Sequence, residues 1–499
     1  MSIEPASPPE ADLESRFDLW RGRAGFLLAP LVFLALWFAP LDLPAPAHRL
    51  AAILASVAIL WVAESIPMPV TALVAAAVCV LAEVAPAKKV FAPFAEQLMF
   101  LFIGSFILAR AIFLHGLDKR FAYGVMSLSI VGTSPLRILF AYGAVTAFIS
   151  AWISNTATTA MMFAIGLSLI RFFDSRPGGC PPAYATVLLL MTSFSASIGG
   201  LATPIGTPPN AIGLGFIRNQ LQVDIPFFDW MLLGVPIVIV LYLFLFAYLA
   251  WFGARGTGPI AGGDLLIREQ AQSLGPWTAG QRSTVFAFGL TIALWILPGV
   301  VALLFGETSP AYKSLRDMLP EAVPAILGAG LLFLLPGNRS GKVLTWDDAA
   351  QIDWGVVLLY GGGFALGELS RETGLAAAIG HGLTSWLPEA GPWGLVIAAA
   401  VVAVLVSEAT SNTAAANIVI PVVIPLAQSA GVDPLEPALA ATFAASLGFM
   451  LPVSTPCNAI VYGSGRIPLT RMIRYGLLLD LAGIAVVVLL VRTLTPLIR

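Results

Sequence analysis

The sequence predicts an all-α polytopic membrane protein with about 11 transmembrane helices. Of its 499 residues, 58% are hydrophobic and only 11% are charged, whereas soluble proteins carry about 25% charged residues. Many apolar runs reach the roughly 20 residues that a helix needs to cross about 30 Å of hydrocarbon. These runs are continuous rather than alternating in polarity, which favours helices over the strands of a membrane barrel.

A repeated sequence divides the chain into two similar halves. The motif SNTATTA from Ser154 returns as SNTAAAN from Ser411, 257 residues later. The segment TPPNAIGLG from Thr207 returns as TPCNAIVYG from Thr455, at an offset of 248. The loop that follows the first SNT motif is longer than its counterpart, which accounts for the difference between the two offsets.

The polar parts of the chain lie at the N-terminus and at the centre. Residues 1–24 are rich in Pro, Glu and Ser and lack the pattern of a secretory signal, so we interpret them as a cytoplasmic tail. Residues 253–282 are Gly-rich and charged, which predicts a linker. The predicted organisation is therefore the tail at 1–24, a leading transmembrane helix with its loop at 25–49, the first half at 50–252, the linker at 253–282 and the second half at 283–499.

The predicted spans follow one another in the same order in both halves. After the leading helix, each half has five apolar segments that suit a crossing. The spans are expected near 25–40, 50–66, 68–85, 97–116, 185–222 and 228–252, and then near 283–305, 320–336, 353–370, 438–463 and 472–495.

Each half also contains an apolar block with an SNT motif near its centre, at 136–173 and at 388–430. Both blocks are too long for one untilted crossing, and a polar centre suits a turn, so we predict two re-entrant helical hairpins. Five crossings per half give the halves opposite orientations, which is an inverted repeat. With the N-terminus in the cytoplasm, 16 Lys and Arg residues fall inside and nine outside, as the positive-inside rule expects.

Composition excludes several classes of function. A net charge of −2 and the absence of a basic tract argue against nucleic acid as a partner. The cysteines Cys79, Cys180 and Cys457 have no paired or metal-like spacing, so we expect no disulfide, zinc site or cofactor. An intramembrane enzyme would need a nucleophile with a base, or a metal site, at depth. The three histidines all fall near predicted span ends, which disfavours that class.

The duplicated polar motifs have the composition of an ion site. Irregular backbone is tolerated at membrane depth only where it is buried in protein or lines a watery cavity. Prolines in the TPxN segments free backbone carbonyls, oxygen ligands suit hard cations, and helix N-termini suit anions. No Lys or Arg lies in these motifs, so a bound anion would need co-bound cations. Ser, Thr and Asn also join membrane helices, but duplication in register favours a binding site.

Together with WVAESIPMPVTAL from Trp61, the paired SNT and TPxN motifs resemble those of the divalent anion:sodium symporters, the DASS or INDY family. The resemblance covers nearly the whole chain. It implies carriage of di- or tricarboxylates or sulfate across the cell inner (plasma) membrane. It further implies 11 spans, two opposed hairpins and a homodimer, in which a transport domain moves as an elevator past a fixed scaffold domain.

The resemblance also implies a set of site residues. Departures from the family pattern, SNTAAAN in the second motif and Cys457 in place of a proline, leave the sodium count and the substrate open. The first sodium site would use Ser150, Ser154, Asn155 and the carbonyl of Gly206, and the second Ser407, Thr410, Asn412 and the carbonyl of Ser454. Substrate would contact Asn155, Thr156, Asn412 and Thr413, with Thr207, Pro208, Thr455 and Pro456 behind.

The function expected from these features is sodium-coupled uptake of a C4-dicarboxylate such as succinate, malate or fumarate. Sodium would be the coupling ion, and no other cofactor is expected. Close alternatives are a sodium-independent dicarboxylate exchanger and a citrate or sulfate carrier. From other classes, an intramembrane enzyme and a channel remain.

Overall fold

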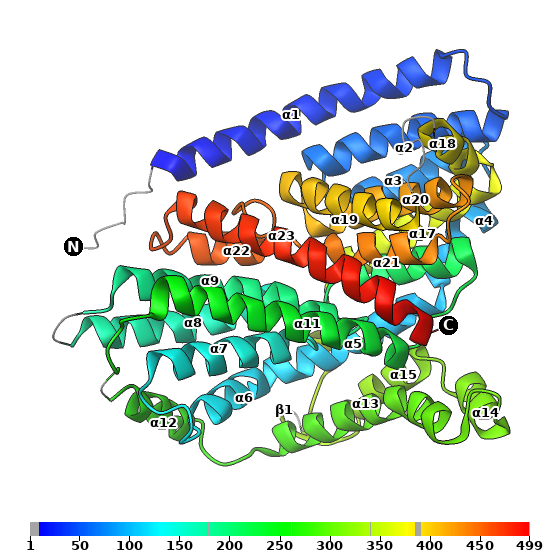
Figure 1. Ribbon diagram of the computed structural model, residues 1–499. Coiled ribbons are helices and arrows are strands. Elements are labelled where there is room, and N and C mark those ends of the chain that lie inside the picture. Colours follow the sequence, from blue (N-terminus) through cyan, green and yellow to red (C-terminus); the bar gives the residue numbers. More distant parts are fainter. Residues whose placement is uncertain (1–8, 177–178, 261, 340, 385–390, 499) are drawn as a thin grey trace.

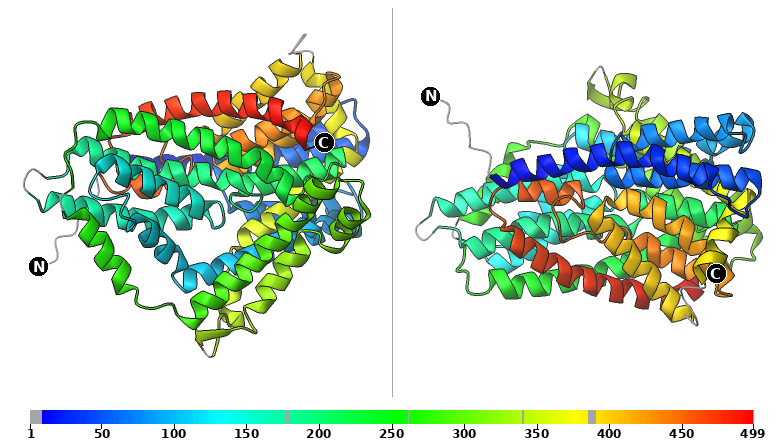
Figure 2. Two further views of the ribbon diagram at one scale, coloured as in Figure 1. Left: turned by 60° about the horizontal axis from the view of Figure 1, so that its bottom comes forward. Right: turned by 90° about the horizontal axis from the view of Figure 1, so that it is seen from above.

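The computed structural model describes residues 9–176, 179–260, 262–339, 341–384 and 391–498. Nearly all of this part of the chain is helical, and most long helices run roughly along one direction (Figure 1). Ten of the described helices are long and apolar enough to cross a membrane. Helix α1 begins at one end of the bundle and α23 finishes at the other (Figure 2), as an odd number of crossings requires.

The elements of the first half match the predicted order of spans. In chain order they are α1 (Pro9–Phe38), α2 (Ala45–Ala63), α3 (Met68–Leu81), α4 (Ala87–Phe91), η1 (Ala92–Ala95), α5 (Gln97–Leu114), α6 (Leu117–Met126), α7 (Pro135–Ser150), α8 (Asn155–Asp174), α9 (Pro182–Gly199), η2 (Gly200–Ala202), α10 (Pro208–Phe216), η3 (Ile217–Leu221), α11 (Phe227–Leu249) and η4 (Ala250–Ala254).

The second half follows α12, which lies within the predicted linker. Its elements are α12 (Gly263–Ser273), α13 (Ala279–Phe305), α14 (Pro310–Met318), α15 (Ala322–Leu331), β1 (Pro336–Arg339), α16 (Trp346–Ala349), α17 (Trp354–Glu372), α18 (Leu375–Thr384), α19 (Pro392–Ala409), α20 (Asn412–Ser429), α21 (Leu435–Ala444), α22 (Pro456–Tyr462), α23 (Leu469–Leu494) and η5 (Thr495–Leu497).

The leading helix is longer than its apolar run. Helix α1 begins at Pro9, so its part from residue 9 to residue 24, more than four turns, falls inside the segment predicted as a tail. Glu, Ala and Leu are good helix formers, and these residues need no lipid contact to be helical.

Both predicted hairpins are pairs of helices joined by short turns. Helices α7 and α8 form the first, and α19 and α20 form the second, although residues 388–390 of that prediction lie outside the described chain. The open end of the first hairpin is at the left of Figure 1 and that of the second at the right. The two turns therefore point into the bundle from opposite ends, which is the arrangement expected for an inverted repeat.

The two predicted broken spans are interrupted at the TPxN segments. The first consists of α9, η2 and α10, and the second of α21 and α22. The two halves pack against each other here, with α8 against α22 and α20 against α10. Each hairpin therefore meets the short helix that follows the break in the other half.

Candidate cation and substrate site

Two buried asparagines stabilise the breaks in the spans. Asn210 Nδ2 donates to the carbonyls of Gly200 and Thr203 at 2.9 and 2.8 Å. In the second half, Asn458 Nδ2 donates to the carbonyls of Gly448 and Leu451 at 3.0 and 2.9 Å. These carbonyls lack the helical partners they would have in an unbroken span, and an unpaired buried carbonyl is costly. The final residue of each TPxN segment thus keeps unwound backbone stable at depth.

The Asn155 amide at the tip of the first hairpin lies in a group of oxygen atoms. One terminal atom of this amide lies 2.7 Å from Ser150 Oγ. The same position is 3.2 Å from the Gly206 carbonyl oxygen and 3.1 Å from that of Ala196. The other terminal atom lies 3.4 Å from Thr207 Oγ1.

The two orientations of the Asn155 amide have different chemistry. When nitrogen faces the group, it donates to the carbonyls of Gly206 and Ala196. When oxygen faces the group, it meets the two carbonyls and the Ser150 hydroxyl, so four oxygens converge. Acceptor oxygens with few donors among them repel one another, and a hard cation would stabilise such a group. The cluster is therefore a group of oxygens of the kind that cations prefer in one orientation, and a closed hydrogen-bond network in the other.

Glycines make room for this amide. A Cβ atom on Gly200 would lie 2.5 Å from Asn155 Oδ1, and one on Gly206 would lie 2.5 Å from the Gly200 carbonyl oxygen. Real Cβ atoms do not approach so closely, so both positions require glycine.

The second hairpin has a related cluster. Ser407 Oγ lies 2.8 Å from Asn412 Oδ1 and 2.8 Å from the Ala445 carbonyl oxygen. Ser407 and Asn412 thus repeat the arrangement of Ser150 and Asn155. The hydroxyl of Thr410 donates to the carbonyl of Val406, in the helix that ends just before it, at 2.6 Å, and its oxygen keeps lone pairs that could face an ion.

The predicted substrate residues lie where the two halves meet. Helix α8, which begins at the first SNT motif, packs against α22, which begins at the second TPxN segment. Asn155, Thr156, Asn412, Thr413 and Pro208 are partly exposed, Pro456 is exposed, and Thr207 and Thr455 are buried. Ser154 is exposed, and its side chain makes no capping hydrogen bond to α8.

Sequence reasoning missed Glu408, which lies between the predicted ligands Ser407 and Thr410. Its side chain accepts hydrogen bonds from the backbone nitrogens of Met450 and Leu451 at 2.7 and 3.2 Å. It also accepts one from Ser454 Oγ at 2.5 Å. An acid three residues before an SNT motif, within an apolar block, was the available signal.

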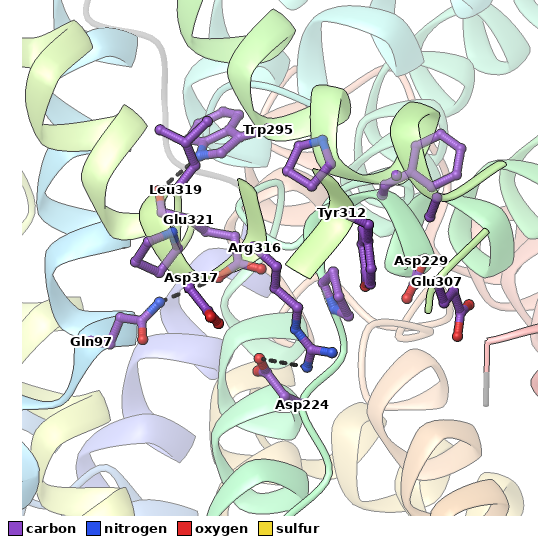
Figure 3. A pocket seen from close by; sticks show the side chains of 16 residues that line it. Gln97, Asp224, Asp229, Trp295, Glu307, Tyr312, Arg316, Asp317, Leu319 and Glu321 are labelled. Carbon is purple, nitrogen blue, oxygen red and sulfur yellow. Dashed lines mark hydrogen bonds and ion pairs between the residues drawn. The ribbon is translucent and has the colours of Figure 1, made fainter. Parts of the chain in front are cut away.

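A separate pocket of about 340 Å³ lies among α11, α13, α14 and α15 (Figure 3). Arg316 points toward Asp224 across it, with a nitrogen–oxygen distance of 3.7 Å. No predicted site residue lines this pocket. Its excess of carboxylates disfavours an anionic substrate. The carboxylates are those of Asp224, Asp229, Glu307, Asp317 and Glu321.

Comparison with known proteins decides the family. Residues 22–498 match the family model described as the sodium:sulfate symporter transmembrane region. The chain belongs to this family. It is 32% identical over 484 residues to a sodium-dependent dicarboxylate transporter, SdcS, of Staphylococcus saprophyticus, covering 95% of this chain and 91% of the relative. An SdcS of Staphylococcus aureus (strain USA300) is 32% identical over 485 residues, with the same coverage.

Two solved structures share the fold of this symporter-family chain. The transporter MtrF of Neisseria gonorrhoeae, described as one of a class of antimetabolite efflux pumps, aligns with a TM-score of 0.56 at 15% identity, covering 92% of this chain and 97% of that one. The Alcanivorax borkumensis YdaH transporter aligns with a TM-score of 0.50 at 14% identity, covering 89% and 98%. At these identities the likeness concerns the fold alone. The predicted all-α membrane fold is confirmed, and the family is one of transporters.

Proposed function

We propose that this chain is a secondary transporter that takes up C4-dicarboxylates, such as succinate, malate and fumarate, together with sodium. The relatives named sodium-dependent dicarboxylate transporters support both the ion and the substrate class. The protein would act in the plasma membrane as a homodimer, with its N-terminus in the cytoplasm. Its transport domain would contain both hairpins and both broken spans and would move as an elevator.

The observation that carries this proposal is the position of Asn155. In the sodium-free protein we expect the amide nitrogen to face the carbonyls of Gly206 and Ala196, because it donates to them in that orientation, and the amide oxygen to face Thr207. When sodium binds, the oxygen turns to the ion and the NH₂ group turns toward Thr207, 3.4 Å away. A donor now faces the partly exposed side of the cluster, where a substrate carboxylate would bind.

Sodium therefore binds first and prepares the anion site. An amide oxygen facing a carboxylate repels it, whereas an amide N–H group donates to it. The ion also supplies positive charge that the SNT and TPxN motifs lack. A site with these two properties binds substrate weakly until it is loaded with sodium, and this is the thermodynamic basis of coupling.

Uptake of labelled succinate into proteoliposomes tests the function. We expect uptake driven by an inward sodium gradient without internal succinate. Asn155→Ala and Asn412→Ala should each abolish uptake, while Asn338→Ala, at an exposed position in β1, should not. Uptake that needs internal succinate and ignores sodium would instead identify an exchanger.

A further inference from the structure

Two acidic side chains meet in the interior of the second half. Glu408 lies near the end of α19 and is 4% exposed, and Asp480 lies in α23 and is 2% exposed. Helices α19 and α23 pack against each other. Gly476, one turn before Asp480, lies against the backbone of Phe449 and Met450, and the Met450 nitrogen donates to Glu408. Buried acids inside a membrane protein are rare and are functional by default.

The two carboxylates differ in their partners. Both oxygens of Glu408 accept hydrogen bonds, from Met450 N, Leu451 N and Ser454 Oγ. Neither oxygen of Asp480 has a hydrogen-bond partner in the described chain. Asp480 is therefore a buried acid without a hydrogen-bond partner in the described chain, on a helix that packs against that of a second buried acid, and such a pair needs a shared proton or a bound cation.

The first half lacks both acids. At the repeat offset of 257, Glu408 corresponds to Ala151. The residue of the first half that corresponds to Asp480 can be found by comparing how α23 and α11 pack against the broken spans. Gly476 of α23 would place a Cβ atom 2.4 Å from the Phe449 carbonyl oxygen, and Gly234 of α11 would place one 2.5 Å from the Leu201 carbonyl oxygen.

Phe449 and Leu201 are themselves equivalent at the offset of 248, so the two glycines occupy equivalent positions. Asp480 and Val238 each lie four residues beyond their glycine. The pair of acids in one half thus corresponds to an apolar pair in the other. The first half adopts the same fold without these two acids, so the fold does not require them. They therefore serve a function specific to the second half.

We propose that Glu408 and Asp480 hold a further sodium ion between α19 and α23, in addition to the ions at the two SNT motifs. A hard monovalent cation suits a pair of carboxylates with neighbouring hydroxyl and carbonyl oxygens. The ion would join α23 to the unwound segment before α22, through the bonds that Glu408 makes to that segment. This inference rests on the proposed coupling to sodium and assigns one more ion to it.

Counting sodium ions tests the proposal. Equilibrium binding of radioactive sodium to the purified protein gives the number of ions per protomer. The reversal potential of succinate uptake in proteoliposomes gives the number of ions per substrate. Asp480→Asn should lower both numbers by one. The double variant Glu408→Ala/Asp480→Val, which copies the first half, should do the same and keeps the test valid if the single variant fails to fold. Asp118→Asn removes another buried acid, in α6, and should leave both counts unchanged.

The outcomes separate this inference from the proposed function. Sodium-driven uptake in the unaltered protein, with unchanged sodium counts in both variants, would overturn the further site alone. No sodium-driven uptake in the unaltered protein would overturn the proposed function, while the binding count would still decide whether the acids hold an ion. Loss of proton movement, rather than of a sodium ion, in Asp480→Asn would show that the acids share a proton and would also overturn the proposal.

Discussion

Replacing the asparagine that stabilises each broken span should destabilise the two halves unequally. The Asn458 side chain makes three hydrogen bonds, two donated to carbonyls and one accepted from Ser193 Oγ at 2.6 Å. Asn210 makes two, both donated. At about 1 kcal/mol net for each bond, Asn458→Ala should cost about 3 kcal/mol and Asn210→Ala about 2 kcal/mol.

Thermal unfolding of the purified protein in detergent, followed by tryptophan fluorescence, measures this difference. We expect both variants to unfold at lower temperature than the unaltered protein, with Asn458→Ala the lower of the two. Gln272→Ala, at an exposed amide side chain in α12, provides the control and should unfold normally. A larger loss of stability in Asn210→Ala than in Asn458→Ala, or normal unfolding of both variants, would contradict the prediction.

Three further predictions concern the ion site, the acidic pocket and topology. Gly200→Ala should lower the sodium affinity of succinate uptake at least tenfold, because the new Cβ atom would lie 2.5 Å from Asn155 Oδ1. Gly448→Ala should have a smaller effect, because its Cβ atom would lie 3.1 Å from both Asn412 Oδ1 and Ser407 Oγ. Arg316→Gln should leave the KM for succinate within about twofold and change stability by less than about 1 kcal/mol, because an exposed ion pair contributes little; loss of succinate binding would show that the acidic pocket holds substrate. Burial, reinforced by a nearby carboxylate, raises the pKa of Cys180 to about 11, so its maleimide labelling should rise about tenfold per pH unit from pH 7 to 9 and should occur only from the cytoplasmic side. A labelling midpoint near pH 8.5, or labelling from outside, would contradict that prediction.

The hairpins and broken spans could be predicted because their signals are local and duplicated. A Pro-rich TPxN segment breaks a helix wherever it occurs, and an SNT motif at the centre of a long apolar block favours a turn. The structure has α7–α8 and α19–α20 at the two blocks and breaks both spans at TPxN.

Other features depend on contacts that the sequence does not contain. Glu408 and Asp480 are separated by 72 positions in the sequence, and the packing of α19 against α23 brings their helices together. Ser154 and Thr410 belong to the motif pattern, but spacing does not determine where a hydroxyl points. Ser154 is exposed, and the Thr410 hydroxyl donates to the carbonyl of Val406. The start of α1 could not be found from hydropathy, because helix formation there needs no apolar run.

The proposed coupling requires that sodium turns the Asn155 amide and thereby creates the anion site. Calorimetric titration of the purified protein with succinate, in sodium and then in choline at equal ionic strength, measures this dependence. We predict that replacing sodium with choline weakens succinate binding at least tenfold, which is about 1.4 kcal/mol. Equal affinity in the two solutions would contradict this requirement.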